Sequence, residues 1–248
     1  MLTAPSRRTI LTASAVSLVL LGSACAPGKD GTTKPDSNQS AAASTSASPD
    51  TRGKTTAELV ALLVTKTDLP THTIEPMNSG PGEIIDTDKP ECKPLAHTQV
   101  MQSIGTNTGL ARAIVMEEPK AATSPDVPQG AVQFTSTSVT LTSYEGTGAQ
   151  DALATVKAAI PACAGGFTIL HKDVTTPVAG VKPDTQLTTG DESVSFVITM
   201  DMGKGVNKAT HSVVVRKGNT LATFWAMNLN GEAQQPKTII DTQIHKLH

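Results

Sequence analysis

The chain has 248 residues, enough for one large domain or two small ones. Aromatic residues make up only 2% of the chain and the formal net charge is −2, so neither a base-stacking platform nor a basic surface for a polyanion is indicated. Three cysteines exclude a dense disulfide scaffold and a four-thiolate zinc site within one chain. We therefore expect no nucleic-acid partner, and no motif indicates a cofactor.

The first 24 residues have the layout of a secretory signal. Arg7 and Arg8 form a positive n-region, and the apolar stretch from Ile10 to Leu21 that follows is too short to span a bilayer stably by itself. Three small residues then lead to Cys25: Gly22, Ser23 and Ala24. The two adjacent arginines fit both the general and the twin-arginine export route.

The end of this signal resembles the lipobox of bacterial lipoproteins, although Gly22 stands where leucine is usual. The resemblance implies that residues 1–24 are removed and that Cys25, with a diacylglyceryl lipid on its thiol, becomes the mature N-terminus. The alternative is ordinary signal cleavage that leaves a free thiol. Several lipid chains on one cysteine make attachment effectively stable, so we expect the membrane to be the partner of the N-terminus.

Residues 26–53 are predicted to be a disordered tether, because they contain no valine, isoleucine, leucine, methionine or aromatic residue. A flexible coil of about 28 residues reaches roughly 30 Å. Without Arg7 and Arg8 the mature chain has 18 basic and 22 acidic residues, so charge does not hold it to an anionic membrane. We expect three parts: a signal (1–24), a lipidated tether (25–53) and an extracytoplasmic domain (54–248).

Two helices are predicted in the first half of this domain. Thr55–Glu58 is a capping-box pattern, leucines follow at helical spacing, and Asp68-Leu69-Pro70 is expected to stop the helix. A second helix is predicted from Cys92. Its apolar side consists of Leu95, Ala96, Val100 and Ile104.

Two more helices are predicted in the second half. The third shows the clearest periodicity and is expected to close at Pro161. Its apolar face consists of Ala149, Ala152, Leu153, Val156, Ala159 and Ile160. The last begins near Pro236, a residue that suits a first helical position, and Ile240, Ile244 and Leu247 point inward.

Strands are predicted between these helices. Residues 193–202 alternate between apolar and polar with period two, and Gly218-Asn219 is a hairpin signal between Val213–Val215 and Leu221–Leu229. The last of these runs is apolar on both faces, which indicates a central strand. Ala131–Phe134 and Val139–Leu141 alternate out of phase, so they form either two short strands or one with a bulge. The predicted class is α+β, with a mainly antiparallel sheet flanked by about four helices.

Cys92 and Cys163 are predicted to form a disulfide. Export places them in an oxidising compartment, and with Cys25 acylated their number is even. Such a bridge joins the start of the second helix to the end of the third. Two buried free thiols or a redox couple are the alternatives, and the absence of Cys-x-x-Cys spacing disfavours the redox couple.

No motif assigns a catalytic or metal site. The histidines are His72, His97, His171, His211, His245 and His248. There is no His-Glu-x-x-His and no Gly-x-Ser-x-Gly, although a site assembled from distant residues stays open. We interpret His171 and His211 as surface or edge positions of strands.

Other conspicuous residues have structural interpretations. The adjacent carboxylates Asp191 and Glu192 are expected at a turn or strand entry, because neighbours on a strand point to opposite faces. Trp225, Tyr144 and the pair Met200/Met202 either line an apolar pocket or belong to the core, and a tryptophan in a central strand is more often core.

The order of several short motifs resembles a known family. They are Leu59–Pro70, Glu91-Cys92 with Pro94-Leu95, Leu141–Tyr144, Cys163–Phe167, Gly190–Ser193, and Val213–Arg216 with Gly218–Thr220. Together, over residues 55–247, they resemble the extracellular sensor domain of actinobacterial receptor kinases of the PknH type and the lipoproteins that carry this domain alone. The resemblance implies an antiparallel sheet flanked by helices and a cleft for an unidentified ligand. The kinase sensor has two disulfides, whereas this chain can form only Cys92–Cys163.

Three functions follow as hypotheses. The first is a membrane-anchored, non-catalytic sensor-like module that binds a small or apolar ligand or a partner protein, with ligand-binding residues not assigned. The second is a carrier of envelope lipid or glycolipid, for which a dry apolar cavity well above roughly 1,000 Å³ is the diagnostic feature. The third is a cell-wall hydrolase, which needs a convergent Ser/His/Asp geometry.

Overall fold

The computed structural model describes residues 52–77, 85–118, 120–121, 132–133, 135–228 and 231–247. The predicted signal, Cys25, the tether before Arg52, and His248 lie outside these ranges. Across the described ranges, no helix combines the length and the apolar character needed to cross a membrane.

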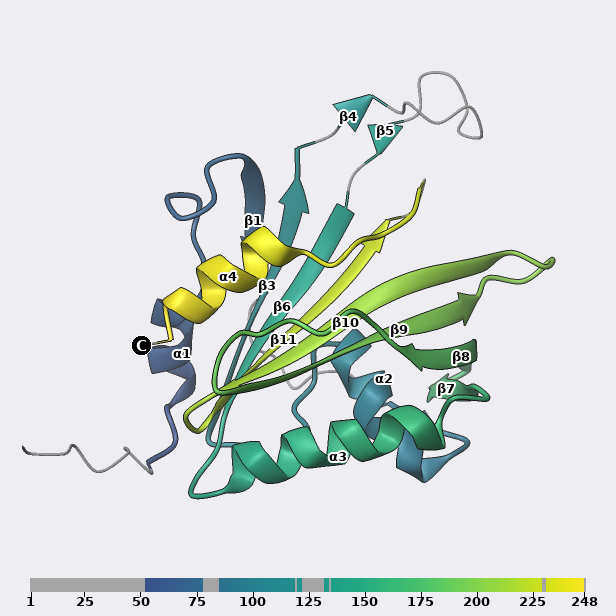
Figure 1. Cartoon of the computed structure of the whole chain (residues 1–248), viewed down its shortest axis with the longest axis horizontal. Helices are drawn as coiled ribbons and strands as arrows, with labels where there is room; N and C mark the ends of the chain where they lie inside the picture. Colours follow the sequence, from purple (N-terminus) through teal and green to yellow (C-terminus); the bar gives the residue numbers. More distant parts are fainter. Residues whose placement is uncertain are drawn as a thin grey trace, which may run out of the picture. The chain divides into compact units, whose positions relative to one another are not determined.

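One nine-stranded sheet, antiparallel between all neighbours, forms the centre of the fold (Figure 1). In spatial order its strands are β1 (His72–Pro76), β3 (Gly109–Glu117), β6 (Thr135–Ser143), β11 (Thr220–Asn228), β10 (Asn207–Lys217), β9 (Glu192–Asp201), β8 (Val174–Pro183), β7 (Phe167–His171) and β2 (Asp86–Thr87). Two short strands, β4 (Lys120–Ala121) and β5 (Val132–Gln133), pair only with each other.

Helices cover both faces of the sheet (Figure 1). One face carries α1 (Thr56–Leu62) and α4 (Lys237–His245). The other carries α2 (Lys93–Gln99), preceded by the 3₁₀ turn η1 (Pro90–Cys92), and α3 (Gly148–Ala162). The predicted α+β class, with a mainly antiparallel sheet and four flanking helices, is confirmed.

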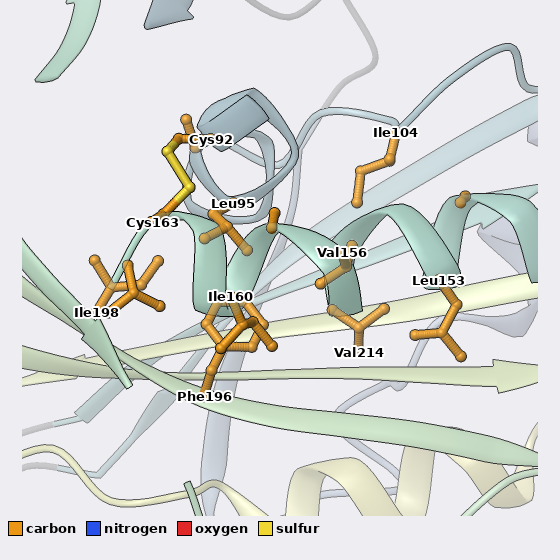
Figure 2. Packing of buried hydrophobic residues seen from close by; sticks show 14 of the residues in the cluster. Cys92, Leu95, Ile104, Leu153, Val156, Ile160, Cys163, Phe196, Ile198 and Val214 are labelled. Carbon is orange, nitrogen blue, oxygen red and sulfur yellow. A yellow bond between two sulfur atoms is a disulfide. The ribbon is translucent and has the colours of Figure 1, made fainter. Parts of the chain in front are cut away.

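Two apolar cores result from this layering. Val213, Val214 and Val215 of β10 are all fully buried, yet Val214 packs under α2 and α3 whereas its two neighbours pack under α1 and α4. Figure 2 shows the first core, in which Phe196 lies between the sheet and α3. Because successive strand residues point to opposite faces, a strand covered on both sides is apolar throughout, and β11 is the central strand expected from its sequence.

The first helix begins as predicted but ends earlier. The hydroxyl of Thr55 accepts a hydrogen bond from the Glu58 amide, and the Glu58 carboxylate accepts one from the Thr55 amide, which completes the capping box. The helix ends at Leu62, not near residues 68–70. The carboxylate of Asp68 binds both the amide and the hydroxyl of Thr65 at 2.7 Å, and this local turn replaces further helix.

The other helices differ from the prediction at their ends. α2 ends at Gln99, because Met101 adopts a positive φ of 56°, so Ile104 joins the core from a loop. α3 continues one residue past Pro161, to Ala162. In α4, Pro236 is the capping residue and not the first helical one. The predicted inward residues of α4 are buried: Ile240, Ile244 and Leu247.

The strand predictions hold with one correction. β9 and the β10–β11 hairpin form as expected, with Gly218 at a φ of 58° in the turn. Residues 132–143 form two strands: β6 is one continuous strand of the main sheet, and β5 belongs to the separate pair. Ala131, Phe134 and Leu229 lie outside the described residues. Met202 lies beyond the end of β9 in the turn to β10 and is 57% exposed, not part of the alternating strand.

Candidate functional site

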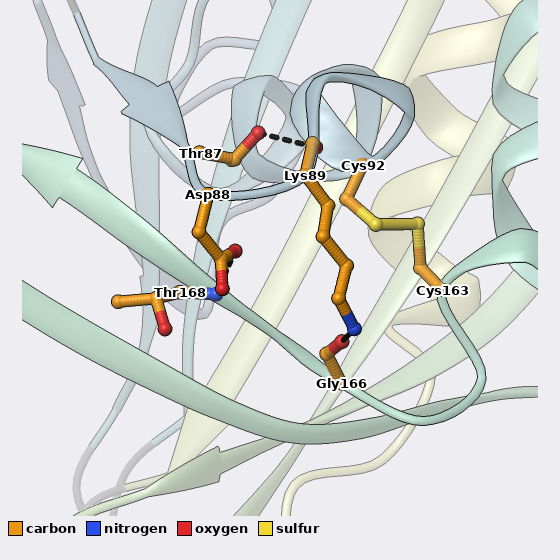
Figure 3. The surroundings of a disulfide bond; sticks show 7 residues. All are labelled: Thr87, Asp88, Lys89, Cys92, Cys163, Gly166 and Thr168. Carbon is orange, nitrogen blue, oxygen red and sulfur yellow. Dashed lines mark hydrogen bonds between the residues drawn. A yellow bond between two sulfur atoms is a disulfide. The ribbon is translucent and has the colours of Figure 1, made fainter.

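The predicted disulfide between Cys92 and Cys163 is confirmed. The two sulfur atoms are bonded, the Cα atoms lie 5.8 Å apart, and both side chains are fully buried (Figure 3). The bridge joins the start of α2 to the end of α3. Two hydrogen bonds flank it: Lys89 Nζ donates to the Gly166 carbonyl at 2.5 Å, and the Thr168 amide donates to Asp88 Oδ1 at 2.7 Å.

A hollow of about 1010 Å³ lies on the opposite face of the sheet, under the start of α4. We call it the α4 trough. It is lined by residues 71–72 at the start of β1, 117–118 at the end of β3, 184–185 between β8 and β9, His211 of β10, and 232–239. Its volume lies at the upper end of the range for small-molecule sites.

Asp184 joins three segments of the trough wall. Its Oδ2 accepts hydrogen bonds from His211 Nδ1 at 2.6 Å and from Gln235 Nε2 at 2.9 Å, and its Oδ1 accepts one from the Thr185 amide at 2.7 Å. Burial of Asp184 opposes ionisation, but the hydrogen bonds from His211, Thr185 and Gln235 outweigh it and lower the pKa below its usual 3.8. The Asp184 carboxylate therefore connects the segment that leads into α4 to β10.

The part of the trough wall formed by β1 and the end of β3 is acidic. His72 and Glu117 stand directly opposite each other on β1 and β3, so both side chains lie on the trough face of the sheet. His72 is only 9% exposed, and its Nδ1 lies 3.2 Å from the Thr71 hydroxyl. In the part of the chain that the structure describes, neither Glu117 nor the exposed Glu118 has an ion-pair partner.

A second part of the trough wall is the N-terminus of α4. Pro236 provides no side-chain cap, and no acidic residue occupies the first turn. Lys237, which is exposed, is the first helical residue and also lines the trough. The first amides of a helix have no partner within the helix and carry partial positive charge, so this end of the trough favours an anion.

A smaller hollow of about 500 Å³ lies between α2 and α3. His97 lines it, with Nδ1 2.7 Å from the Ser103 carbonyl, and burial lowers the pKa of this histidine. Tyr144 also lines it; its hydroxyl donates to the Ile104 carbonyl at 3.0 Å, and burial raises its pKa to about 12. Of the aromatic residues singled out in the sequence, Tyr144 therefore does face a pocket.

The histidines do not gather into one centre. The interpretation of His211 as a surface or edge residue is wrong, because β10 is an interior strand and the ring is paired with Asp184. His171 lies on β7, next to the edge strand β2. Within the described ranges, no group of three histidine, cysteine or acidic side chains is placed to hold a metal ion. The ring of His211 is hydrogen-bonded to Asp184 and not to a hydroxyl group.

The adjacent carboxylates Asp191 and Glu192 have structural roles. Asp191 immediately precedes β9 and its Oδ2 accepts a hydrogen bond from the Gly218 amide at 2.7 Å, which agrees with the predicted turn or strand entry. Glu192 begins β9 and pairs with Lys157 of α3. Both carboxylates thus connect β9 to neighbouring elements.

Trp225 and Met200 belong to the face of the sheet under α2 and α3. Trp225 is partly buried on β11, on the same face as Leu221. Met200 of β9 is partly buried and packs against the same core. The interpretation of these two residues as core positions fits their surroundings better than a pocket lining.

Sequence reasoning did not find the residues that build the α4 trough. Asp184 and His211 are 27 positions apart, and Gln235 lies in a polar segment without a motif. The weak signal in the sequence is Pro236, a helix start preceded by no serine, threonine, aspartate or asparagine that could cap it.

Comparison with known proteins places the fold. No protein-family model and no curated protein matches the chain. Among solved structures, the extracellular domain of PknH from Mycobacterium tuberculosis matches with a TM-score of 0.53 at 15% identity, over 79% of this chain and 97% of that one. An uncharacterised protein from Mycobacterium smegmatis matches with a TM-score of 0.34 at 10% identity, over 77% and 93%. The domain thus has the fold of the PknH extracellular domain, as the order of its motifs predicted.

Proposed function

We propose that this chain is a lipoprotein on the extracytoplasmic face of the cell membrane, whose domain binds a ligand in the α4 trough without catalysing a reaction. The observation that carries the proposal is the trough itself. Its volume is about 1010 Å³, and its wall is fixed by the hydrogen bonds of Asp184 to His211 and Gln235. The fold shared with a kinase extracellular domain agrees with a sensor-like role outside the cell.

The position of the trough relative to the start of the domain supports this role. The Arg52 carbonyl accepts a hydrogen bond from Asn219 in the β10–β11 turn, and the Lys54 amide donates to Ser143 at the end of β6. The trough lies at the opposite end of the same strands, roughly 27 Å away along β3 from Gly109 to Glu117. The trough is therefore remote from Arg52, where the described part of the chain begins.

The side chains of the trough favour binding over the other two hypotheses. Asp184 already accepts three hydrogen bonds, so it serves to hold the wall. The volume of about 1010 Å³ is not well above the roughly 1,000 Å³ expected of a lipid carrier, and the lining includes Glu117, Glu118 and Lys237, so it is not a dry apolar cavity. The hydrolase hypothesis needs a hydroxyl, a histidine and a carboxylate in one chain of hydrogen bonds. Among the described residues, His211 contacts Asp184 but no hydroxyl or thiol, and His72 contacts the Thr71 hydroxyl but no carboxylate.

Native mass spectrometry of the protein purified from its own membrane tests the binding function. We expect a retained small molecule that denaturation releases. Thr238→Trp places a large ring at the trough and should abolish retention, whereas Asp241→Asn, on the exposed side of the same helix, should not. Retention by Thr238→Trp would exclude the trough as the site, and no retained mass even after incubation with envelope extract would overturn the binding function.

Anchoring is tested separately at Cys25. Cys25→Ser removes the thiol that accepts the lipid, so we expect the protein in the culture medium or uncleaved at the membrane. Fractionation with mass determination of the N-terminus distinguishes these forms. A processed Cys25→Ser protein that still sediments with membranes would show that the lipid is not the anchor.

A further inference from the structure

We propose that the α4 trough takes an extended zwitterionic ligand, a short peptide with free ends. Its carboxylate lies at the N-terminus of α4 beside Lys237, and its amino group lies at Glu117 and Glu118. This inference rests on the proposed binding function and names the chemical class of the ligand.

The helix end is prepared for a carboxylate. The Lys237 amide donates a hydrogen bond to the Gln235 carbonyl, and the Ile240 amide donates one to the Pro236 carbonyl. Between them, the amides of Thr238 and Ile239 have no acceptor among the residues described. Two adjacent N–H groups, a neighbouring ammonium and the positive end of the helix dipole together match a carboxylate group.

Asp184 connects the segment before this helix to β10. Gln235, two residues before Lys237, donates to the same carboxylate oxygen that His211 of β10 contacts. Gln235 Nε2 also lies 2.6 Å from the Thr185 carbonyl, so the amide side chain is held from two directions. The position of the anion site across the sheet is therefore set by side-chain contacts and not by the helix alone.

The opposite end is prepared for an ammonium group. Glu117 and Glu118 are two adjacent carboxylates at the end of β3, and His72 stands beside them with more than nine-tenths of its surface buried. The Nδ1 of His72 contacts the Thr71 hydroxyl, and its Nε2 has no partner in the described part of the chain. With the proton on Nδ1, Nε2 is an acceptor for an N–H of the ligand.

The length of the trough suits a short peptide. Its lining includes residues at the end of β3 and on β10, which are separated by β6 and β11, three strand spacings or roughly 14 Å. About four extended residues cover that length.

Glu232 is the remaining acidic residue of the lining, exposed on the segment before α4. Its charge opposes a carboxylate at this end and increases the selectivity for a ligand whose other end is cationic. Removing it should therefore strengthen peptide binding.

The test uses the full-length lipidated protein in detergent micelles, dialysed against random tetrapeptide libraries with free ends, acetylated N-termini or amidated C-termini. Depletion of each library is measured by mass spectrometry. We expect binding of free-ended peptides and roughly ten-fold weaker binding when either end is blocked.

Variants assign each end of the peptide. In the double variant Glu117→Gln/Glu118→Gln, acetylation of the peptide N-terminus should no longer weaken binding. In Lys237→Ala, amidation of the C-terminus should weaken binding less than in the natural protein. Glu232→Gln should strengthen peptide binding about three-fold. Glu145→Gln, exposed at the other end of the domain, is the matched control.

Equal binding of free and blocked peptides, or depletion of none, would overturn the peptide inference. The proposed binding function fails separately, by the native mass spectrum. A retained molecule that is not a zwitterion would leave that function standing and exclude this ligand class.

Discussion

The two faces of the sheet are stabilised in different ways. Under α2 and α3 lies a continuous apolar cluster whose helices are joined by the Cys92–Cys163 disulfide. Under α1 and α4 the centre is equally apolar, but the helices are positioned by polar side chains. Gln243 of α4 donates to the Leu62 carbonyl and accepts from the Val64 amide, and Asp184 holds the segment before α4.

This difference indicates which face can serve a ligand. A covalent bridge and an apolar core favour a single arrangement of α2 and α3, and the hollow between these helices, about 500 Å³, is half the size of the trough. On the other face, the N-terminus of α4 carries a charged side chain, Lys237, and backbone amides that line the trough. A ligand can replace water at these groups. The trough accordingly lies on the face without the disulfide.

The largest effect is expected from removing the disulfide. Replacing both Cys92 and Cys163 with serine releases a closed loop of about seventy residues in the unfolded chain, a destabilisation of at most roughly 4 kcal/mol in the chain-entropy model. For a domain of this size, at about 2–4 °C per kcal/mol, the thermal midpoint should fall by several degrees, up to about 16 °C. Calorimetry measures this shift. Ligand retention at the trough should persist at low temperature, because the architecture of the folded state is kept.

Mass mapping of unreduced peptides is the control for the pairing itself. Free thiols at both positions in exported protein would contradict the bridge. An unchanged midpoint for the double variant would show that α2 and α3 are held by packing alone.

An intermediate effect is expected at the polar contact between α1 and α4. Gln243→Leu keeps the approximate volume but leaves the Leu62 carbonyl and the Val64 amide without their side-chain partner in a buried environment. Each unsatisfied group costs about 1–3 kcal/mol, or about 2–6 kcal/mol for the two, and the burial of the apolar leucine side chain offsets part of this. We therefore expect a net loss of roughly 2–4 kcal/mol in unfolding free energy. Urea unfolding measures it, and exposed Asp241→Asn on the same helix should change it little. A loss equal to that of the control would mean that the apolar core alone positions α4.

Local rules explain how much of this fold could be predicted from sequence. The capping box at Thr55 and Glu58 and the hairpin at Gly218 depend on neighbouring residues, so the pattern is sufficient. The Cys92–Cys163 pair follows from the even count and the oxidising compartment. The first helix ends at Leu62, earlier than predicted, because the Asp68 side chain binds the Thr65 amide and forms a turn in place of further helix. The spacing of apolar residues, from which the helix was predicted, does not report such a side-chain contact.

The trough could not be predicted for a different reason. Its wall depends on Asp184, His211 and Gln235, which meet only because the end of β8, β10 and the segment before α4 are brought together by the sheet. The sequence makes His211 resemble an edge residue, because polar residues in strands usually face solvent. The carboxylate that makes a buried position acceptable for this ring is far away in the chain.

The smallest effect is expected at Asp184, and it should depend on pH. Asp184→Asn keeps the shape but removes the charge that strengthens the hydrogen bonds from His211 and Gln235, a cost of about 1 kcal/mol at neutral pH. The pKa of Asp184 is lowered in the folded protein, so its stabilisation is complete above the ordinary value of 3.8 and is lost as the pH falls through the lower folded value.

The unfolding free energy of the natural protein, minus that of the Asp184→Asn variant, should therefore shrink as the pH falls below about pH 4. Urea titrations on either side of this pH measure the difference, with Asp173→Asn in the exposed β7–β8 turn as control. A difference that persists unchanged at about pH 3 would mean that the ionised carboxylate does not hold the trough wall. The N-terminus of α4 beside Lys237 would then be positioned by apolar packing under α1 and α4.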